Sequence, residues 1–389
     1  MKKKLLKYNL ATNTWSQAEK KAAISVIESE MFTMGDKVKV FEKAFSNYFN
    51  SKYSIMVNSG SSANLLAVAS LFYKKNKPLK KGDEVIVPAV SWSTTYFPLL
   101  QYGLKLKFVD IDLQTLNFDI HELENSISRK TKLIFAVNLL GNSNEFNKIK
   151  KLIKGKDIYL LEDNCESMGA KFNGVFTGTI GDIGTFSTYF SHHINTIEGG
   201  VITTKDEELY HIMLSLRSHG WTRHLPNPNK IIKKRNNSFE ESFRFILPGY
   251  NLRPMEISAA IGIEQLKKLD KFLKVRRENA KYFIKTFEDD ERLILQKEIS
   301  LSSWFGFSII LKNIERKKVI KKMGENNIEF RPIVSGNFLK NDVMKYFDFE
   351  KTSGLDNANY LHENGFFVGN HHYQIKEEID LLKKIISNV

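Results

Sequence analysis

The chain has 389 residues, 42% apolar and 26% charged, with a formal net charge of +14. This length can bury a substantial core, whereas no apolar run approaches the roughly 18–20 residues that cross a bilayer, and the start MKKKLLKYNL lacks the apolar stretch of a secretory signal. The single cysteine, Cys165, excludes an internal disulfide and a self-contained iron–sulfur cluster held by several thiolates. We therefore expect a cytoplasmic protein without a membrane anchor.

The positive charge has more than one interpretation. A lysine-rich solvated surface explains it, and so does the attraction of an anionic substrate such as a nucleotide diphosphate. Nucleic-acid binding has less support, since the sequence contains neither zinc-finger spacing nor an aromatic RNA-binding motif.

The first two thirds of the chain alternate short apolar runs with helical patterns. YSIMVNSGSSANLL predicts a strand, a tight turn and a helix start, and further strands are predicted in DEVIVPAV, LKFVDID, KLIFAVNLLG, DIYLLED, GTFSTYF and GGVITT. Strands interleaved with helices indicate an α/β fold with a mainly parallel sheet. Such sheets bind ligands at the carboxyl ends of their strands.

The pattern changes further along the chain. Thr222–Phe245 is polar and basic and predicts a long loop, and Glu256–Glu288 is a long helical pattern. Strands are then predicted in WFGFSIIL, IEFRPIV and GFFVGN, with helices around Ile314–Asn327 and Lys376–Val389. We predict a large α/β domain over residues 1–270 and a smaller α+β domain over residues 271–389.

Three predicted strand ends carry candidate site residues. Gly60, Ser61 and Ser62 lie at a helix start, where free N–H groups and hydroxyls bind phosphate, although serine also caps helices for structural reasons. Asp163 ends an apolar strand, where it either forms a salt bridge or cap, or holds a protonated pyridine nitrogen. Trp92 is either core or a stacking partner for an aromatic ring.

The stretch GDIGTFSTYFSHHINTIEGGVITT resembles the DegT/DnrJ/EryC1/StrS sugar aminotransferase family, which has the type I aminotransferase fold. In that family a lysine before the Glu-Gly-Gly motif bonds covalently to pyridoxal phosphate. Counting back from Glu198, the lysine position here holds His192. Histidine forms no stable imine with an aldehyde, but it can act as a base near neutral pH.

This change is similar to one subgroup of the family, the pyridoxamine-phosphate-dependent 3-dehydratases of nucleotide-linked 4-keto-6-deoxyhexoses. NLLGN, RSHGW, PGYNLRPMEISAAIG, FRPIVSGNF and HENGFFVGNH add to the resemblance, which covers nearly the whole chain. One branch of these dehydratases uses an iron–sulfur cluster and a CDP-sugar, and the lone cysteine disfavours it. The resemblance therefore implies a cluster-free lyase, with GDP-4-keto-6-deoxymannose as the expected substrate and surface polysaccharide (O-antigen) synthesis as its setting.

The resemblance also implies roles for individual residues. His192 is the expected catalytic acid and base, and Arg217, His219 and Arg331 are expected near the substrate. Asn251 is expected to reach the phosphate in a partner subunit's site, which implies a homodimer with shared active sites. The expected cofactor-binding residues of the chain itself are Gly60, Ser61, Trp92, Asp163, Glu166 and Ser187.

Two histidine pairs remain open to interpretation. His193 either packs or orients its neighbour His192. His371 and His372 either line the sugar or nucleotide pocket or form a metal site, but adjacent residues rarely point the same way in a strand. We expect no metal.

The implied cycle removes the C3 hydroxyl of the keto-sugar, and glutamate restores the amine form of the cofactor. Two other functions stay open at this point. A nucleotide-sugar aminotransferase would share the fold and most of the pocket, and a non-catalytic binding or regulatory relative would share the fold alone.

Overall fold

The computed structural model describes residues 7–352 and 354–389. Its large sheet has the strand order β1-β9-β8-β5-β4-β2-β3-β13. Strand β9 is antiparallel to both of its neighbours, while β8, β5, β4, β2, β3 and β13 are mutually parallel. This confirms the predicted α/β fold with a mainly parallel sheet. The strands are β1 (Tyr53–Val57), β2 (Glu84–Pro88), β3 (Lys105–Val109), β4 (Thr131–Val137), β5 (Tyr159–Asp163), β8 (Ile183–Ser187), β9 (Gly200–Thr204) and β13 (Phe349–Lys351).

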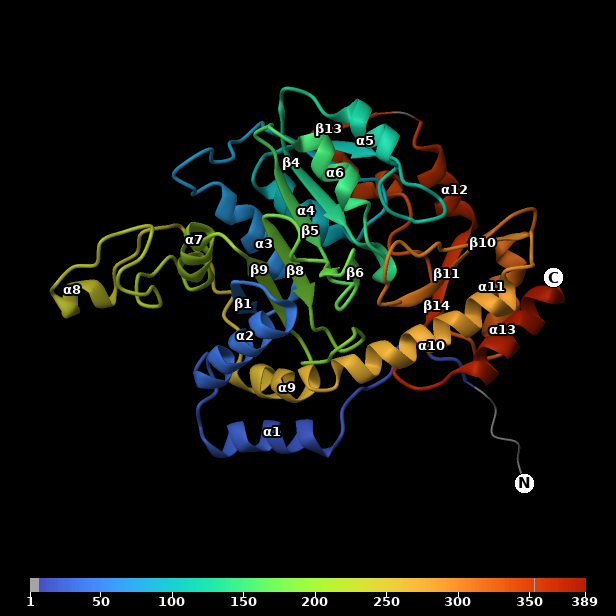
Figure 1. Ribbon diagram of the computed structural model, residues 1–389, viewed down its shortest axis with the longest axis horizontal. Coiled ribbons are helices and arrows are strands. Elements are labelled where there is room, and N and C mark those ends of the chain that lie inside the picture. Colours follow the sequence, from blue (N-terminus) through green and yellow to red (C-terminus); the bar gives the residue numbers. More distant parts are fainter. Residues whose placement is uncertain (1–6, 353) are drawn as a thin grey trace.

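Helices cover both faces of this sheet (Figure 1). Because successive side chains of a strand point to opposite faces, β4 buries Phe135 against one layer and Ile134 against the other. One layer contains α3 (Gly60–Leu71), α4 (Ser93–Gln101) and α7 (Glu207–Arg217). The other contains α2 (Asp36–Phe49), α5 (Ile120–Ser126), α6 (Phe146–Ile153) and α9 (Glu256–Leu266).

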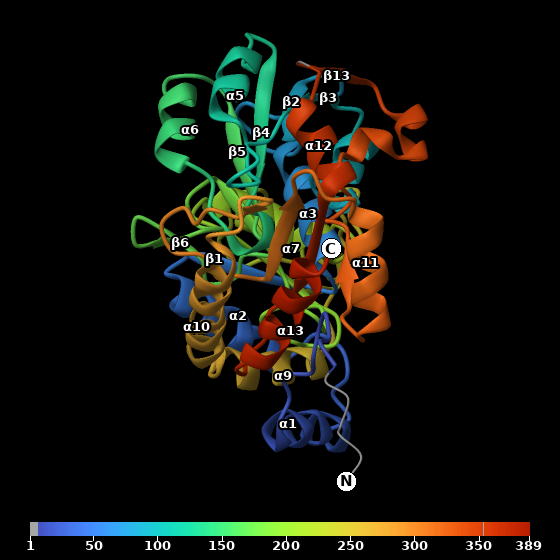
Figure 2. The same cartoon turned by 90° about the vertical axis from the view of Figure 1, so that its right-hand side faces the viewer.

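Two outlying helices flank these layers. Helix α1 (Gln17–Glu28) packs on α9 and lies away from the large sheet in both views (Figures 1 and 2). Helix α8 (Ser238–Ser242) is a short turn within the predicted loop and lies at the far end of the molecule from α13 (Figure 1). The remaining short elements here are β6 (Lys171–Phe172), β7 (Val175–Phe176) and the 3-10 turn η1 (Leu139–Gly141).

The predicted helical pattern from residue 256 forms two helices rather than one. Helix α9 ends at Leu266, and α10 (Leu269–Phe287) runs from there beside α13 (Lys376–Ser387) (Figure 2). Helix α9 is buried on most sides, whereas α10 is amphipathic. The short break between them lets the two helices turn different faces toward the core.

The C-terminal part forms a second, antiparallel sheet with the order β10-β11-β14-β12. Its core includes Phe283, Phe307 and Ile379, and also Tyr8, whose hydroxyl donates to Gly369 O at 2.6 Å. Strand β13, by contrast, joins the edge of the large sheet beside β3. Tyr8 from the N-terminal segment therefore packs with the second sheet, and β13 from the C-terminal part pairs with the first. The division at residues 270 and 271 stays a prediction. The elements are β10 (Leu293–Leu295), β11 (Gly306–Leu311), α11 (Arg316–Glu325), β12 (Phe330–Arg331), η2 (Phe338–Lys340), η3 (Asp342–Tyr346), α12 (Asp356–Asn364) and β14 (Gly365–Gly369).

Candidate functional site

The start of α3 lies directly against the end of β8. A Cβ atom added to Gly60 would lie 2.7 Å from Ser187 Cβ and 3.1 Å from Cys165 Sγ, so only glycine allows this approach. Ser59 caps the helix by accepting from Ser62 N at 3.0 Å. The first-turn N–H groups of Gly60 and Ser61 have no intrahelical partner. Together with the Ser187 hydroxyl, they can hold the phosphate of a cofactor at a positive helix end.

Asp163 ends β5 and is only 6% exposed. Its Oδ2 accepts from Asn64 Nδ2 at 2.8 Å and from Thr95 Oγ1 at 2.7 Å, and its Oδ1 accepts from Cys165 N at 3.2 Å. Thr185 Oγ1 in turn donates to Asn64 Oδ1 at 2.6 Å. These bonds orient an acceptor-only carboxylate, which suits a protonated pyridine nitrogen.

The neighbouring Glu162 has a structural role instead. It is fully buried and accepts from the backbone N–H groups of Gly178, Ile180 and Gly181 at 2.6, 2.6 and 2.7 Å. Glu162 therefore holds the backbone of residues 178–181, and only the Asp163 carboxylate lies with the other candidate site residues. Asn64, Thr95 and Thr185 were not singled out from the sequence, because their role depends on Asp163, 22 or more residues away in the chain.

Trp92 precedes α4 and is 58% exposed. An indole with this exposure is not a core residue. It has a free face on which an aromatic ring can stack.

Glu166 lies one turn beyond Asp163 and is partly buried. Its Oε2 accepts from Leu140 N at 3.1 Å, in the turn η1, where Leu140 itself adopts a left-handed conformation. Burial, opposed by the Leu140 N–H and assisted by the charge of Asp163, raises the pKa of Glu166 to about 7. Glu166 can therefore hold or release a proton near neutral pH.

His192 lies in the loop between β8 and β9. Its backbone N–H donates to Tyr189 O at 2.9 Å. In the ring, Nδ1 lies 3.5 Å from Ser191 Oγ, and Phe305 packs edge-on with 5.1 Å between the ring centroids. The residue keeps some accessible surface, yet burial, assisted by the charge of Arg276, lowers the pKa of His192 to about 4. The imidazole is therefore neutral at pH 7 and available as a base.

His193 points into the protein instead. It is fully buried, its Nε2 lies 3.1 Å from Ser303 O, and burial lowers its pKa well below the ordinary value. Phe305 contacts both histidine rings. The arrangement indicates that His193 anchors the loop of its neighbour.

The residues expected near the substrate fall in three different places. Arg217 is 3% exposed, and its Nη1 donates to Glu42 Oε1 at 2.5 Å and to Met56 O at 2.7 Å. This internal ion pair does not support the expected substrate contact, because the guanidinium is already engaged in the core. His219 is partly buried beside Trp221, with ring centroids 5.3 Å apart. Arg331 is exposed on β12.

Asn251 is exposed and bonds only locally: its Oδ1 accepts from Arg253 Nε at 3.0 Å, and its backbone bridges to Ser218. Among the described residues, neither of these contacts joins it to the strand-end residues of its own chain. Its position therefore leaves it available to another subunit.

The two C-terminal histidines point apart. His371 is buried and bonds to Asn9 O at 2.8 Å, whereas the ring of His372 packs on Phe272. Within residues 7–352 and 354–389, no group of three or more histidine, cysteine or acidic side chains could hold a metal ion. The same part of the chain contains no helix long and apolar enough to span a bilayer.

The strand-end residues fit pyridoxal or pyridoxamine phosphate as a set. The close approach of α3 to Ser187, which glycine permits, could hold the phosphate. Asp163 could bind the ring nitrogen, and Trp92 could stack on the ring. His192 supplies an imidazole where a covalent bond would need an amine.

Comparisons with known proteins agree with this description. The chain is 57% identical to the GDP-4-keto-6-deoxy-D-mannose 3-dehydratase of Escherichia coli O55:H7 (strain CB9615 / EPEC), with 98% of this chain and 100% of the relative covered. A structure of the E. coli GDP-4-keto-6-deoxy-D-mannose-3-dehydratase with bound hydrated PLP superposes with a TM-score of 0.97, at 57% identity over 98% of this chain and 99% of the other. A structure of the GDP-4-keto-6-deoxymannose-3-dehydratase with a trapped PLP–glutamate geminal diamine superposes with a TM-score of 0.96, at 57% identity over 97% of this chain and 99% of the other.

The model of the DegT/DnrJ/EryC1/StrS aminotransferase family matches residues 13–386. The fold expected from the resemblance is therefore confirmed, and the chain belongs to the DegT/DnrJ/EryC1/StrS aminotransferase family.

Proposed function

We propose that this protein is a pyridoxamine-phosphate-dependent GDP-4-keto-6-deoxymannose 3-dehydratase, a lyase that removes the C3 hydroxyl of its sugar. The observation that carries the proposal is the neutral imidazole of His192 at the place where the family presents a lysine amine. The 57% identity to the E. coli dehydratase, over 98% of this chain and 100% of the relative, supports the choice of substrate.

The cofactor, when bound, supplies an amine that condenses with the C4 ketone and a ring that withdraws electrons from the reacting carbons. Gly60, Ser61 and Ser187 bind its phosphate, Asp163 its ring nitrogen and Trp92 its face. Each of these residues acts by holding the ring in one orientation, so that binding energy is spent on alignment.

His192 moves the proton. Nδ1 lies 3.5 Å from the Ser191 hydroxyl, so Nε2 is the atom proposed to accept a proton and to return it to the leaving C3 hydroxyl. A neutral ring is needed for the first of these steps, and its burial beside the Arg276 charge keeps it neutral. Glu166, with a pKa of about 7, can hold a second proton nearby, at the position where family aminotransferases commonly carry glutamine.

Glutamate is the proposed amine donor that restores the cofactor after each turnover. The related dehydratase with a trapped PLP–glutamate geminal diamine supports this choice. The keto-sugar product and ammonia leave, and no amino sugar forms.

The proposed assembly is a homodimer with shared active sites. The exposed Asn251 is available to a partner, and large apolar side chains are exposed on and beside α1, among them Ile24, Ile27 and Phe32 at 52%, 55% and 55%. A second copy of the chain would bury such a surface. Sedimentation of the wild-type protein and of Asn251→Ala tests the assembly, since both should be dimeric. A cofactor-binding measurement on the same two proteins tests the shared site, since the variant should bind the cofactor more weakly.

A substrate panel tests the reaction itself. The purified protein, cofactor and glutamate are incubated with GDP-, CDP- and dTDP-linked 4-keto-6-deoxyhexoses, and products are identified by mass spectrometry with ammonia measured in parallel. Loss of the C3 oxygen with ammonia release supports the proposal. Accumulation of an amino sugar would make the protein an aminotransferase, and the absence of any turnover would favour a non-catalytic relative.

A further inference from the structure

The loop that carries His192 closes on itself at its base. Thr196 N donates to Thr188 O at 2.9 Å, Thr188 N donates to Gly199 O at 2.9 Å, and the two threonine hydroxyls lie 2.5 Å apart. These contacts join the two ends of the loop. The outer part, from His192 to Asn195, needs other contacts to hold it.

Asn195, three residues after His192, receives those contacts from two distant segments. Its N–H donates to Gln265 Oε1 at 3.0 Å, and its carbonyl accepts from Trp15 Nε1 at 3.0 Å. Its side-chain Nδ2 also donates to Asn13 Oδ1 at 3.3 Å. The outer part of the loop is therefore tied to the N-terminal segment and to the end of α9.

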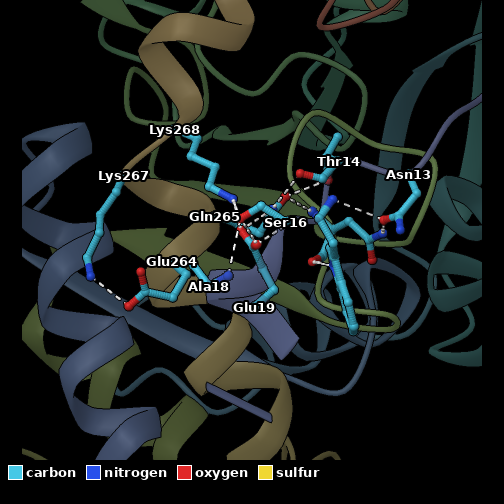
Figure 3. Close-up of polar contacts among 11 residues, drawn as sticks. Asn13, Thr14, Ser16, Ala18, Glu19, Glu264, Gln265, Lys267 and Lys268 are labelled. Carbon is cyan, nitrogen blue, oxygen red and sulfur yellow. Dashed lines mark hydrogen bonds and ion pairs between the residues drawn. The ribbon is translucent and has the colours of Figure 1, made fainter. Parts of the chain in front are cut away.

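Gln265 joins these three segments. It is fully buried, and its Oε1 accepts from Thr14 Oγ1 at 2.6 Å in addition to the Asn195 N–H. Its Nε2 donates to Glu19 Oε1 at 2.7 Å and to Thr14 O at 3.3 Å (Figure 3). All four hydrogen-bonding positions of the amide are used, which fixes its orientation.

Glu19 gives this cluster a fixed charge. Its side chain is fully buried, accepts from Ser16 N at 2.7 Å and pairs with Lys268 at the start of α10 (Figure 3). Burial alone would raise the pKa of Glu19, but the bonds from Lys268, Ser16 and Gln265 outweigh it and lower the pKa to about 2. The carboxylate therefore stays ionised and keeps accepting from Gln265 over the working pH range.

A histidine in place of lysine makes this support matter. A lysine bonded to a cofactor is held at both ends, whereas the imidazole of His192 forms no bond to the cofactor and depends on its own backbone and on packing against Phe305. Displacement of a catalytic group by about 1 Å can reduce a rate by about 100-fold. We propose that Gln265, oriented by Thr14 and Glu19, is a positioning residue for His192: it fixes Asn195 and thereby the loop that presents the imidazole.

The catalytic role of the imidazole rests on the proposed function, but whether Gln265 holds the His192 loop can be tested without turnover. Gln265→Met keeps the length of the side chain and removes its hydrogen bonds. In the protein without substrate, hydrogen exchange of the amides from His192 to Ile197 should become at least about tenfold faster. In the active enzyme, kcat should fall about tenfold while KM changes less than about twofold.

A pH profile separates positioning from general damage. The groups that set the His192 pKa are the Arg276 guanidinium on α10 and the protein that buries the ring. A loosened loop admits water to the ring, which raises the pKa of His192. In Gln265→Met the pH at which kcat falls to half on the acid side should therefore rise, from near 4 toward the ordinary pKa of histidine.

Asn279→Leu is the matched control. Asn279 is also a buried amide, but its Nδ2 donates within the C-terminal part, to Asn370 Oδ1 at 3.1 Å and Tyr373 O at 2.8 Å. This variant should lose stability without changing exchange in the His192 loop. Its acid limb is left out of the comparison, because Asn370 also accepts from Arg276 Nη1 at 2.8 Å. Thr14→Val, which removes only the 2.6 Å bond to Gln265, gives the same comparison with a smaller effect if Gln265→Met does not fold.

Each outcome decides the point. Faster exchange in the His192 loop of Gln265→Met or Thr14→Val, but not of Asn279→Leu, supports the positioning role. The positioning role would be overturned if the His192 loop of Gln265→Met and Thr14→Val exchanged no faster than that of Asn279→Leu and the acid limb of Gln265→Met did not move. A wild-type protein without dehydration would refute the proposed function, while the exchange comparison would still decide whether Gln265 holds the loop.

Discussion

Replacing Glu166 by glutamine should stabilise the protein at alkaline pH and leave it little changed at pH 5. The buried carboxyl has a pKa of about 7, raised from an ordinary 4.5 by burial and by the Asp163 charge. A raised acid pKa means that the folded state favours the protonated form. Stability is therefore lost as the pH rises from about 4.5 to about 7, because the unfolded chain releases this proton first.

The size of the effect follows from that difference. At about 1.4 kcal/mol for each pKa unit, ionising Glu166 in the fold costs about 3.5 kcal/mol relative to the unfolded chain. Most of this cost is present at pH 8, and only a small part of it at pH 5. The glutamine amide of the variant carries no charge, and its oxygen can still accept from Leu140 N. The gain in free energy of unfolding should thus be about 2–3 kcal/mol larger at pH 8 than at pH 5.

Urea unfolding of the cofactor-free protein at the two pH values measures this difference. Glu124→Gln, at an exposed position on α5, is the control and should change stability equally at both. If the gain in free energy of unfolding of Glu166→Gln were the same at pH 5 and pH 8, the raised pKa assigned to the Glu166 carboxyl would be refuted.

Three further predictions concern the cofactor and the base. Asp163→Asn should weaken cofactor binding about 10–100-fold in equilibrium dialysis, because it removes the charged partner of the ring nitrogen; unchanged affinity would contradict that contact. Gly60→Ala should lower the free energy of unfolding by about 1–3 kcal/mol and weaken phosphate binding, since its Cβ would lie 2.7 Å from Ser187 Cβ; a variant of full stability would show that the helix start can shift. In Glu166→Gln, which removes the nearby group with a pKa of about 7, kcat should stay level as the pH falls through 6.5 and decline only toward about 4, because His192 remains neutral over that range; a decline centred near 6.5 would indicate a solvated base.

Local patterns were enough to predict much of this molecule. Alternation of apolar runs with helical patterns predicted the parallel sheet, and the structure has Asp163 at the end of β5 and Gly60 at the start of α3, as the local patterns indicate. Such positions can be predicted because a strand end and the residue that follows it are close in sequence as well as in space, while the cofactor roles of these residues stay predictions. The position of His192 followed from the spacing to Glu198 in one loop.

Long-range pairing was not accessible in the same way. The burial of Arg217 depends on Glu42, 175 residues earlier, so its ion pair has no local pattern. Strand β13 joins the large sheet across more than 200 residues. Gln265 looks like any polar residue near a helix end until the fold brings Thr14 and Asn195 to it. In each case the decisive contact is made by the tertiary structure.

In this protein an imidazole stands at the position where the family bonds its cofactor covalently. Borohydride reduction of the wild-type protein and of His192→Lys, each with one equivalent of pyridoxal phosphate, followed by peptide mass mapping, tests this most directly. Only the variant should fix the cofactor stoichiometrically, on the peptide that contains residue 192, and the variant should lose dehydration. A stoichiometric cofactor adduct on any lysine of the wild-type protein would contradict it.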